Sequence, residues 1–114
     1  MNYTIATGVL NGRSSKKLSG NTYLHPTIGG IMVKYYDTNI IYFKKNGDIL
    51  VDTANHFTKS TKDILNEFLP LCHQGIHQKK GEWFWKDGVP FKDRTIIRED
   101  TQSRRVLHKD NQNI

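Results

Sequence analysis

The pair Asn46-Gly47 is the feature that most constrains how this chain folds. Asn and Gly are the residues that most readily take positive φ, which both central positions of a tight type I′ β-turn require. The flanking residues, 40–45 and 48–52, are rich in β-branched and aromatic side chains, as strands are. The sequence therefore predicts an antiparallel hairpin here, with one strand on each side of the turn.

Several other segments carry strand and helix signals. Residues 31–36 alternate between two faces, as a half-buried strand does. After the hairpin, Thr58 or Ser60 can cap a helix whose apolar side chains share one face, and Pro70 ends it. Further strands are predicted over 21–24, 75–80, 82–86 and 95–98. The predicted fold class is α+β: an antiparallel β-sheet of five to seven short strands with one short α-helix packed on one face.

Length and composition limit the class of protein. With 114 residues, the chain is expected to form a single α+β domain over 21–98, between a flexible basic N-terminal arm over 1–20 and a polar C-terminal tail over 99–114. No apolar run approaches the ~20 residues that span a bilayer, and the first residues lack a signal-peptide core. We therefore expect a soluble protein inside the cell that makes it.

The chain is basic. Seventeen Lys and Arg residues against eleven Asp and Glu residues give a formal net charge of +6. An excess of positive charge favours an anionic partner, such as a nucleotide, a nucleic acid or an acidic protein surface. Because the same excess serves solubility alone in many small proteins, the charge leaves both interpretations open.

The segment between the hairpin and the helix is the main candidate site. It brings hydroxyls, an amide, an imidazole, an aromatic ring and two ammonium groups to a helix start, where backbone N–H groups favour an anion. The candidate ligand-binding residues are Asn55, His56, Phe57, Thr58, Lys59, Ser60, Thr61 and Lys62. Taken one residue at a time, a simpler interpretation is favoured: Ser60 caps the helix, Phe57 packs on the core, and the lysines are solvated.

Three more candidate ligand-binding residues are Lys79, Trp83 and Trp85. On a strand the two tryptophans share one face. If that face is exposed beside lysines, the rings can stack on nucleobases. The favoured alternative is that both tryptophans fill the core.

No metal, cofactor or catalytic residue is expected. Cys72 is the only cysteine, which excludes an internal disulfide and a multi-cysteine zinc site. On a strand, His73 and His77 would lie roughly 13 Å apart, too far to share one zinc without a bend. The chain carries no phosphate-binding glycine loop, nucleophile elbow or paired-histidine motif. Enzymatic activity is left uncertain, with binding favoured over catalysis.

Five segments share a pattern of residues with a known group of proteins: 33–41, 46–51, 57–70, 79–84 and 89–93. The last two read Lys-Lys-Gly-Glu-Trp-Phe and Val-Pro-Phe-Lys-Asp. Over residues 21–97 the chain resembles an uncharacterised family of small tailed-phage and prophage proteins. It departs from the family at Tyr36, where His is usual, at Asn39, where Asp is usual, and at 54–56, where glycines are usual. The resemblance implies a phage origin rather than a reaction.

Four functions remain open at this point. The favoured one is a phage-encoded accessory or counter-defence protein that binds and sequesters a small anionic nucleotide, such as a host immune signal, in the host cytoplasm. The alternatives are a nucleic-acid-binding accessory protein, a protein inhibitor of a host defence complex, and a nucleotide-cleaving enzyme using His56 or His73. A homodimer is slightly favoured over a monomer. The nucleotide interpretation expects Phe57, Trp83 and Lys59 to converge on one concavity.

Overall fold

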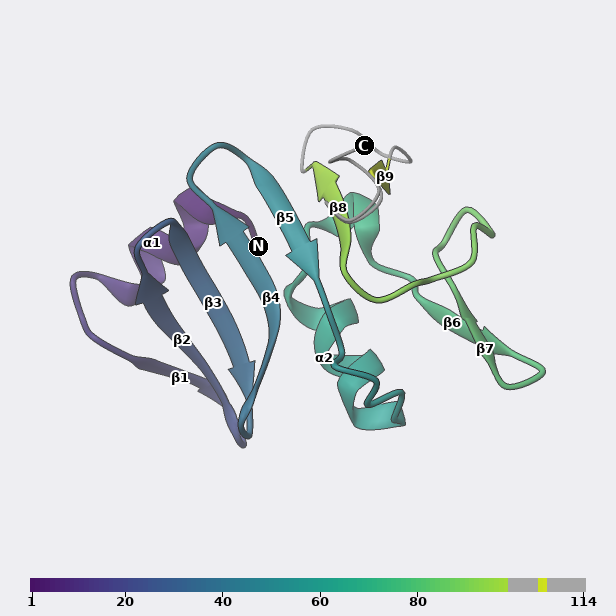
Figure 1. The fold of residues 1–114 in the computed structure, drawn as a ribbon. Coiled ribbons are helices and arrows are strands. Elements are labelled where there is room, and N and C mark those ends of the chain that lie inside the picture. The colour runs from purple at the N-terminus through teal and green to yellow at the C-terminus, as the bar shows by residue number, and fades with distance from the viewer. Residues whose placement is uncertain (99–104, 107–114) are drawn as a thin grey trace.

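The computed structural model describes residues 1–98 and the backbone of residues 105–106. Its main sheet has seven antiparallel strands in the order β1-β2-β3-β4-β5-β8-β9, and β6 and β7 form a separate two-stranded sheet (Figure 1). The strands are β1 (Lys16–Ser19), β2 (Thr22–Thr27), β3 (Gly30–Tyr35), β4 (Thr38–Lys44), β5 (Asp48–Val51), β6 (His77–Lys79), β7 (Glu82–Phe84), β8 (Thr95–Arg98) and β9 (Arg105–Val106). The predicted α+β class is confirmed.

The hairpin predicted from Asn46-Gly47 joins β4 to β5. Its turn is one residue longer than a type I′ turn, because Phe43 pairs with Ile49 and the loop holds three residues. Of the pair, only Gly47 has positive φ, at 96°. The Asn46 side chain instead accepts a hydrogen bond from Asp48 N at 2.9 Å. A turn closed by one left-handed glycine is the usual form of a three-residue hairpin loop.

The prediction of a flexible arm over residues 1–20 is wrong, because this segment forms a helix and a strand. Helix α1 covers Tyr3–Leu10, and β1 pairs with β2. The Asn2 side chain caps α1 by accepting from Ile5 N at 2.8 Å, and the helix ends at Asn11, which has a left-handed φ of 50°. Because Gly8 and β-branched residues lower the helix propensity of this segment, burial of Ala6 and Leu10 against the sheet accounts for the helix.

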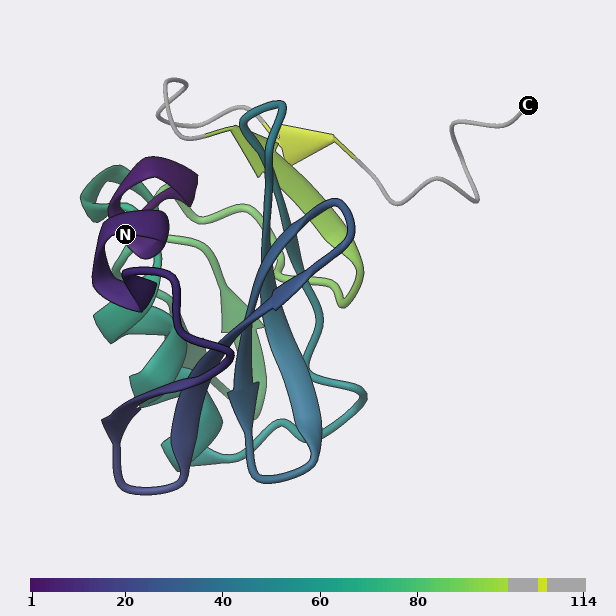
Figure 2. The ribbon, with the colours of Figure 1, turned by 90° about the vertical axis from the view of Figure 1, so that its left-hand side faces the viewer.

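Both helices, α1 and α2 (Lys59–Phe68), lie on the same face of the main sheet (Figure 2). The apolar face predicted for α2 is buried, with Leu65 fully enclosed. Side chains of both helices, of the central strands and of the β6–β7 region form one core, which includes Ala6, Leu10, Val33, Ile41, Phe43, Ile64, Leu65, Phe68, Trp83 and Trp85. A short 3-10 helix, η1 (Leu71–His73), follows α2.

Strand β8 determines what lies next to the α2 start. It pairs with β5, with Asp48 opposite Arg98 and the Arg98 guanidinium 3.2 Å from the Asp48 carboxylate. This pairing brings the loop before β8 against the end of β5, where Arg94 N donates to Val51 O at 2.8 Å. The segment 89–93 of the family pattern therefore lies beside the corner between β5 and α2.

The polar tail expected over 99–114 lies outside the described residues, except for the two residues of β9, which pair with β8. Neither α-helix in the part of the chain that the structure describes is long and apolar enough to cross a membrane.

Candidate functional site

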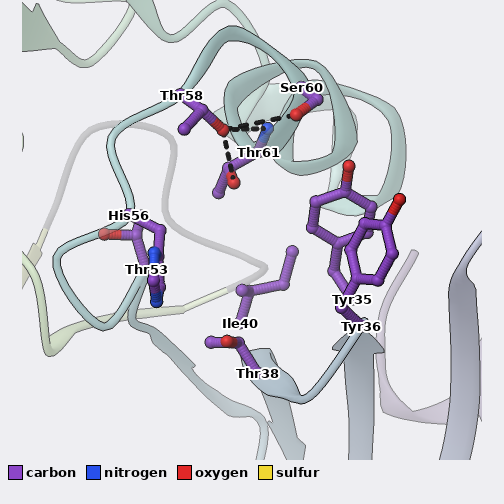
Figure 3. A pocket seen from close by; sticks show the side chains of 9 residues that line it. All are labelled: Tyr35, Tyr36, Thr38, Ile40, Thr53, His56, Thr58, Ser60 and Thr61. Atoms are coloured by element: carbon purple, nitrogen blue, oxygen red, sulfur yellow. Dashed lines mark hydrogen bonds between the residues drawn. The ribbon is translucent and has the colours of Figure 1, made fainter.

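The candidate site is a cavity of about 270 Å³ between the β3–β4 turn and the start of α2 (Figure 3). We call it the corner cavity. It is lined by Tyr35, Tyr36, Thr38, Ile40, Thr53, His56, Thr58, Ser60 and Thr61. Its walls come from the β3–β4 hairpin, the segment between β5 and α2, and the first turn of α2. Four of the eight residues predicted at this corner therefore line one concave site.

Two tyrosines form one wall of the corner cavity. The ring centroids of Tyr35 and Tyr36 lie 4.7 Å apart with an edge-to-face angle of 63°. Neighbouring strand residues normally point to opposite faces, but Tyr36 has a left-handed φ of 53°. Figure 3 shows that both rings consequently stand on the same side, with their hydroxyls toward α2 and with His56 across the cavity. Tyr36 is 61% exposed, so its ring is accessible to a ligand.

A β-bulge supplies the apolar floor. Val33 pairs with Ile41 whereas Lys34 pairs with Asn39, so Ile40 is the extra residue on β4. Both Ile40 and its neighbour Ile41 are buried, although adjacent residues on a regular strand would face opposite sides. Bulges redirect single side chains in this way and occur often beside functional sites. Here the bulge turns Ile40 into the corner cavity.

Asp93 holds the segment between β5 and α2. Its carboxylate accepts hydrogen bonds from Thr53 N at 2.7 Å, from the Thr53 hydroxyl at 2.8 Å and from Asn55 N at 2.9 Å. Between these anchors, Ala54 and Asn55 have left-handed φ values of 53° and 67°. Glycine takes this conformation without a steric cost, which gives a reason for the glycines of the family pattern. His56 follows directly, and its backbone N–H donates to Thr53 O at 3.0 Å.

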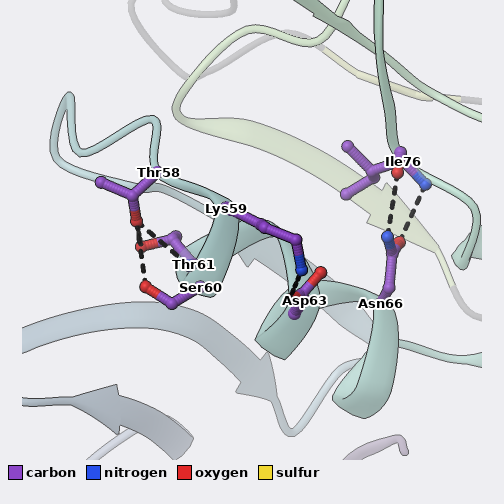
Figure 4. Close-up of polar contacts among 7 residues, drawn as sticks. All are labelled: Thr58, Lys59, Ser60, Thr61, Asp63, Asn66 and Ile76. Carbon is purple, nitrogen blue, oxygen red and sulfur yellow. Dashed lines mark hydrogen bonds and ion pairs between the residues drawn. The ribbon is translucent and has the colours of Figure 1, made fainter.

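Thr58, rather than Ser60, caps α2 (Figure 4). Its Oγ1 accepts from Thr61 N at 3.2 Å and donates to the Thr61 hydroxyl at 3.0 Å. The hydroxyls of Thr58 and Thr61 are thus engaged with each other. Ser60 Oγ lies 3.3 Å from Thr58 Oγ1 on the exposed side of the turn. Ser60 is therefore the hydroxyl at this helix start that is most free to turn toward a ligand.

The lysines expected at the corner do not line it. Lys59 is 84% exposed and forms an ion pair with Asp63 at 2.9 Å (Figure 4). Lys62 lies with its Nζ 6.0 Å from the centroid of the Trp83 ring. Lys79 is exposed in β6. The nine lining residues include no ammonium, guanidinium or carboxylate group, so the helix dipole is the local source of positive potential.

Phe57 faces a different cavity. His56 and Thr58 line the corner cavity, whereas Phe57 lines a second one of about 370 Å³. Its ring centroid lies 5.0 Å from that of Trp83. Phe57 and Trp83 therefore converge on one concavity, as the nucleotide interpretation expects. Lys59 does not join them, and this cavity is separate from the corner cavity.

The interpretation of Trp83 and Trp85 as an exposed stacking platform is wrong. The favoured alternative, that both tryptophans fill the core, is confirmed. Trp83 and Trp85 are 5% and 1% exposed. Trp85 packs against Phe91, with ring centroids 5.1 Å apart, and faces His73 edge-on at 6.2 Å. His73 is itself 1% exposed and has its Nε2 2.7 Å from Arg98 O. Trp85 and His73 therefore cannot reach a surface ligand.

The other titratable groups are dispersed. His77 stacks on Phe84 in the β6–β7 hairpin, with centroids 5.9 Å apart, and Cys72 is half-buried in η1. Over residues 1–98, no group of three His, Cys, Asp or Glu side chains could hold a metal ion. A third cavity, of about 330 Å³ between α1 and the β2–β3 turn, includes the cations Arg13 and Lys45 in its lining.

A model of a known protein family matches the chain. The family model described as Kyanoviridae Gp96 protein matches residues 1–108. The matched region includes the N-terminal residues that the resemblance over 21–97 left out. Neither a curated protein nor a solved structure matches the chain.

Proposed function

The chain belongs to the Kyanoviridae Gp96 family of phage proteins, and from this origin and the corner cavity we propose that it binds and sequesters a small anionic nucleotide in the host cytoplasm without cleaving it. One observation carries the proposal. Two tyrosine rings and an imidazole enclose a cavity that ends at the first turn of a helix. Flat aromatic walls suit a nucleobase, and a helix start suits a phosphate.

The size of the corner cavity limits the ligand. Its volume of about 270 Å³ lies just below the range of ~300–1,000 Å³ typical of ligand pockets. At ~30 Å³ for each water, it would hold about nine waters. This space favours a ligand with one base over a cyclic dinucleotide with two. A ligand of two bases would need a second surface outside the cavity.

The chemistry of the lining assigns a role to each wall. The Tyr35 and Tyr36 rings would contact the base through their edges and faces, with Ile40 beneath it. The first turn of α2 and the Ser60 hydroxyl would donate hydrogen bonds to the phosphate. His56 would complete the opposite wall. Because the nine described lining residues include no lysine or arginine, binding should depend only weakly on salt.

Sequestration is favoured over cleavage because the nine described lining residues include no carboxylate and no imidazole besides that of His56. General acid–base cleavage commonly requires two groups with matched roles. His73, the other histidine considered for catalysis, is buried against Trp85 and does not line the corner cavity. A bound nucleotide would thus be recovered intact, which chromatography of the heat-released ligand tests.

Isothermal titration with a panel of mononucleotides, ADP-ribose and cyclic dinucleotides tests the proposal. We expect heat with at least one single-base ligand. Tyr36→Asn should weaken that binding at least ~5-fold, since a base stack contributes ~1–3 kcal/mol. Asn is chosen because it tolerates the left-handed φ of this position. Tyr23→Asn is the matched control, because Tyr23 is exposed but does not line the cavity.

Two results would contradict the proposal. The first is the absence of heat for every ligand of the panel. The second is binding that Tyr36→Asn leaves unchanged while Arg13→Gln or Lys45→Gln abolishes it. That second result would place the ligand in the cavity between α1 and the β2–β3 turn, where both cations lie.

A further inference from the structure

We propose that the second cavity binds single-stranded nucleic acid, with a base against its rings and the phosphates on the surrounding lysines. We call this cavity the aromatic groove. It is lined by Phe57, Gly81, Glu82, Trp83, Phe84, Pro90, Phe91 and Lys92. It lies apart from the corner cavity and shares no lining residue with it. The inference is therefore independent of the function proposed above.

The rings of the aromatic groove pack against one another. Trp83 and Phe91 are buried at its base, with centroids 5.5 Å apart. Phe57 stands edge-on to both, at 5.0 Å from Trp83 and 6.2 Å from Phe91. Phe57 is nevertheless 44% exposed. One fixed and accessible ring above a buried aromatic base is what a stacking platform for a nucleobase requires.

Backbone hydrogen bonds fix the two chain segments that form the groove. Phe91 N donates to Trp83 O at 3.0 Å and Trp85 N donates to Val89 O at 2.8 Å. Phe84 and Pro90 form an isolated antiparallel bridge. The segment around Pro90 thus lies alongside β7. Little ordering of the backbone would be needed when a ligand binds, which favours affinity.

The charges around the groove match a phosphate backbone. Lys62 lies 6.0 Å above the Trp83 ring, and Lys92 is in the lining. Lys79 and Lys80 directly precede Gly81 of the groove and are exposed at the hairpin tip. These four lysines outnumber the one carboxylate of the lining, that of Glu82. Lys62 is placed so that it can contact both a phosphate and the ring system.

This charge excess decides between two occupants of an aromatic groove. Proline-rich peptides also bind such grooves, but through apolar ridges that gain nothing from four surrounding lysines. A single-stranded nucleic acid uses both features, since its bases stack on rings and its phosphates release counterions on binding lysine. The observations therefore favour nucleic acid, and a proline-rich peptide is the competing outcome of the test.

The test is fluorescence anisotropy of a labelled oligodeoxythymidine of about ten nucleotides, within the usual site size of ~4–16. Affinity should fall steeply between about 50 and 200 mM salt, with a slope of log K against log salt near −0.7 for each phosphate contacted. Lys62→Gln should weaken binding and make the slope less negative by ~0.7. Phe57→Leu, which keeps apolar bulk but removes the ring, should weaken binding at least ~5-fold.

Matched variants separate this site from general charge and from the corner cavity. Lys59→Gln removes the same charge from the same helix turn, but the Lys59 ammonium pairs with Asp63, whereas the Lys62 ammonium lies over the Trp83 ring of the groove. Both Lys59→Gln and Tyr36→Asn should bind the oligonucleotide like the parent protein. The proposal is overturned if the oligonucleotide does not bind at about 50 mM salt, the low-salt end of the series, where phosphate contacts contribute most to affinity. It is also overturned if Lys59→Gln loses as much affinity as Lys62→Gln. A change in tryptophan fluorescence with a proline-rich decapeptide but not with the oligonucleotide would overturn it as well.

Discussion

Asp93 binds Thr53 twice, since its carboxylate accepts both the backbone N–H at 2.7 Å and the side-chain hydroxyl at 2.8 Å. The two residues are 40 positions apart in sequence. The contact joins the loop before β8 to Thr53, which lies between β5 and α2 and lines the corner cavity. It explains how a segment without regular structure can present His56 in a defined position.

Asp93→Asn should destabilise the protein by ~2 kcal/mol, because hydrogen bonds to a charged acceptor contribute ~1.5–3 kcal/mol and the new amide would face N–H donors. It should also weaken nucleotide binding, although Asp93 does not line the corner cavity. Chemical denaturation and titration measure the two effects. Asp37→Asn, in the exposed β3–β4 turn, is the control and should change stability by less than ~0.5 kcal/mol.

Ala54→Gly should stabilise the protein by ~0.5–1 kcal/mol. Ala54 has a φ of 53°, where an L-residue costs ~1–2 kcal/mol and glycine costs less, partly offset by the greater entropy of glycine in the unfolded chain. The opposite sign is expected for Ala6→Gly, because Ala6 is buried in α1. Equal effects of the two changes on the unfolding midpoint would argue against the described corner backbone.

Thr58→Ala should cost ~1 kcal/mol, as loss of a helix N-cap usually does. Thr58 Oγ1 accepts from Thr61 N, whereas Ser60 makes no such bond to the helix backbone. Ser60→Ala should therefore change stability by less than ~0.5 kcal/mol. Thermal unfolding of both variants and of Thr58→Ser distinguishes the two caps. A larger loss of stability for Ser60→Ala than for Thr58→Ala would instead support Ser60 as the helix cap, as the simpler interpretation of the sequence has it.

Asn66→Ala should cost ~2–3 kcal/mol because one side chain ties α2 to the segment before β6 (Figure 4). Its Oδ1 accepts from Gly75 N at 2.9 Å and from Ile76 N at 2.8 Å, and its Nδ2 donates to Ile76 O at 2.9 Å. Hydrogen exchange at Ile76 should become faster. Glu67→Ala, at an exposed neighbouring position, should leave both stability and exchange nearly unchanged.

Local signals predicted the elements whose residues agree with their surroundings. The hairpin at Asn46-Gly47, the apolar face of α2 and strands β2, β3, β4, β5 and β8 were confirmed on that basis. Helix α1 was missed because its own propensity is low and its stability comes from packing. The Asn2 cap and the Asn11-Gly12 end were visible signals, and with Ala6 and Leu10 spaced four apart they could have identified it.

The candidate site was predicted in part for a similar reason. His56, Thr58, Ser60 and Thr61 are contiguous, so a chain segment revealed them. Tyr36 and Ile40 were missed because they reach the site through a left-handed residue and a bulge, which alternation along a strand does not reveal. The departure from the family pattern at Tyr36 was the available signal. Lys59 and Lys62 were misplaced since their directions depend on Asp63 and Trp83.

Amide chemical-shift mapping with the single-base nucleotide that gives heat in titration tests the central claim most directly. We predict that the largest shifts occur at Tyr36, His56 and Ser60, around the corner cavity. The indole N–H of Trp83, in the aromatic groove, should stay unchanged. Shifts confined to Arg13 and Lys45, or to Trp83, with the corner amides unmoved, would contradict the account.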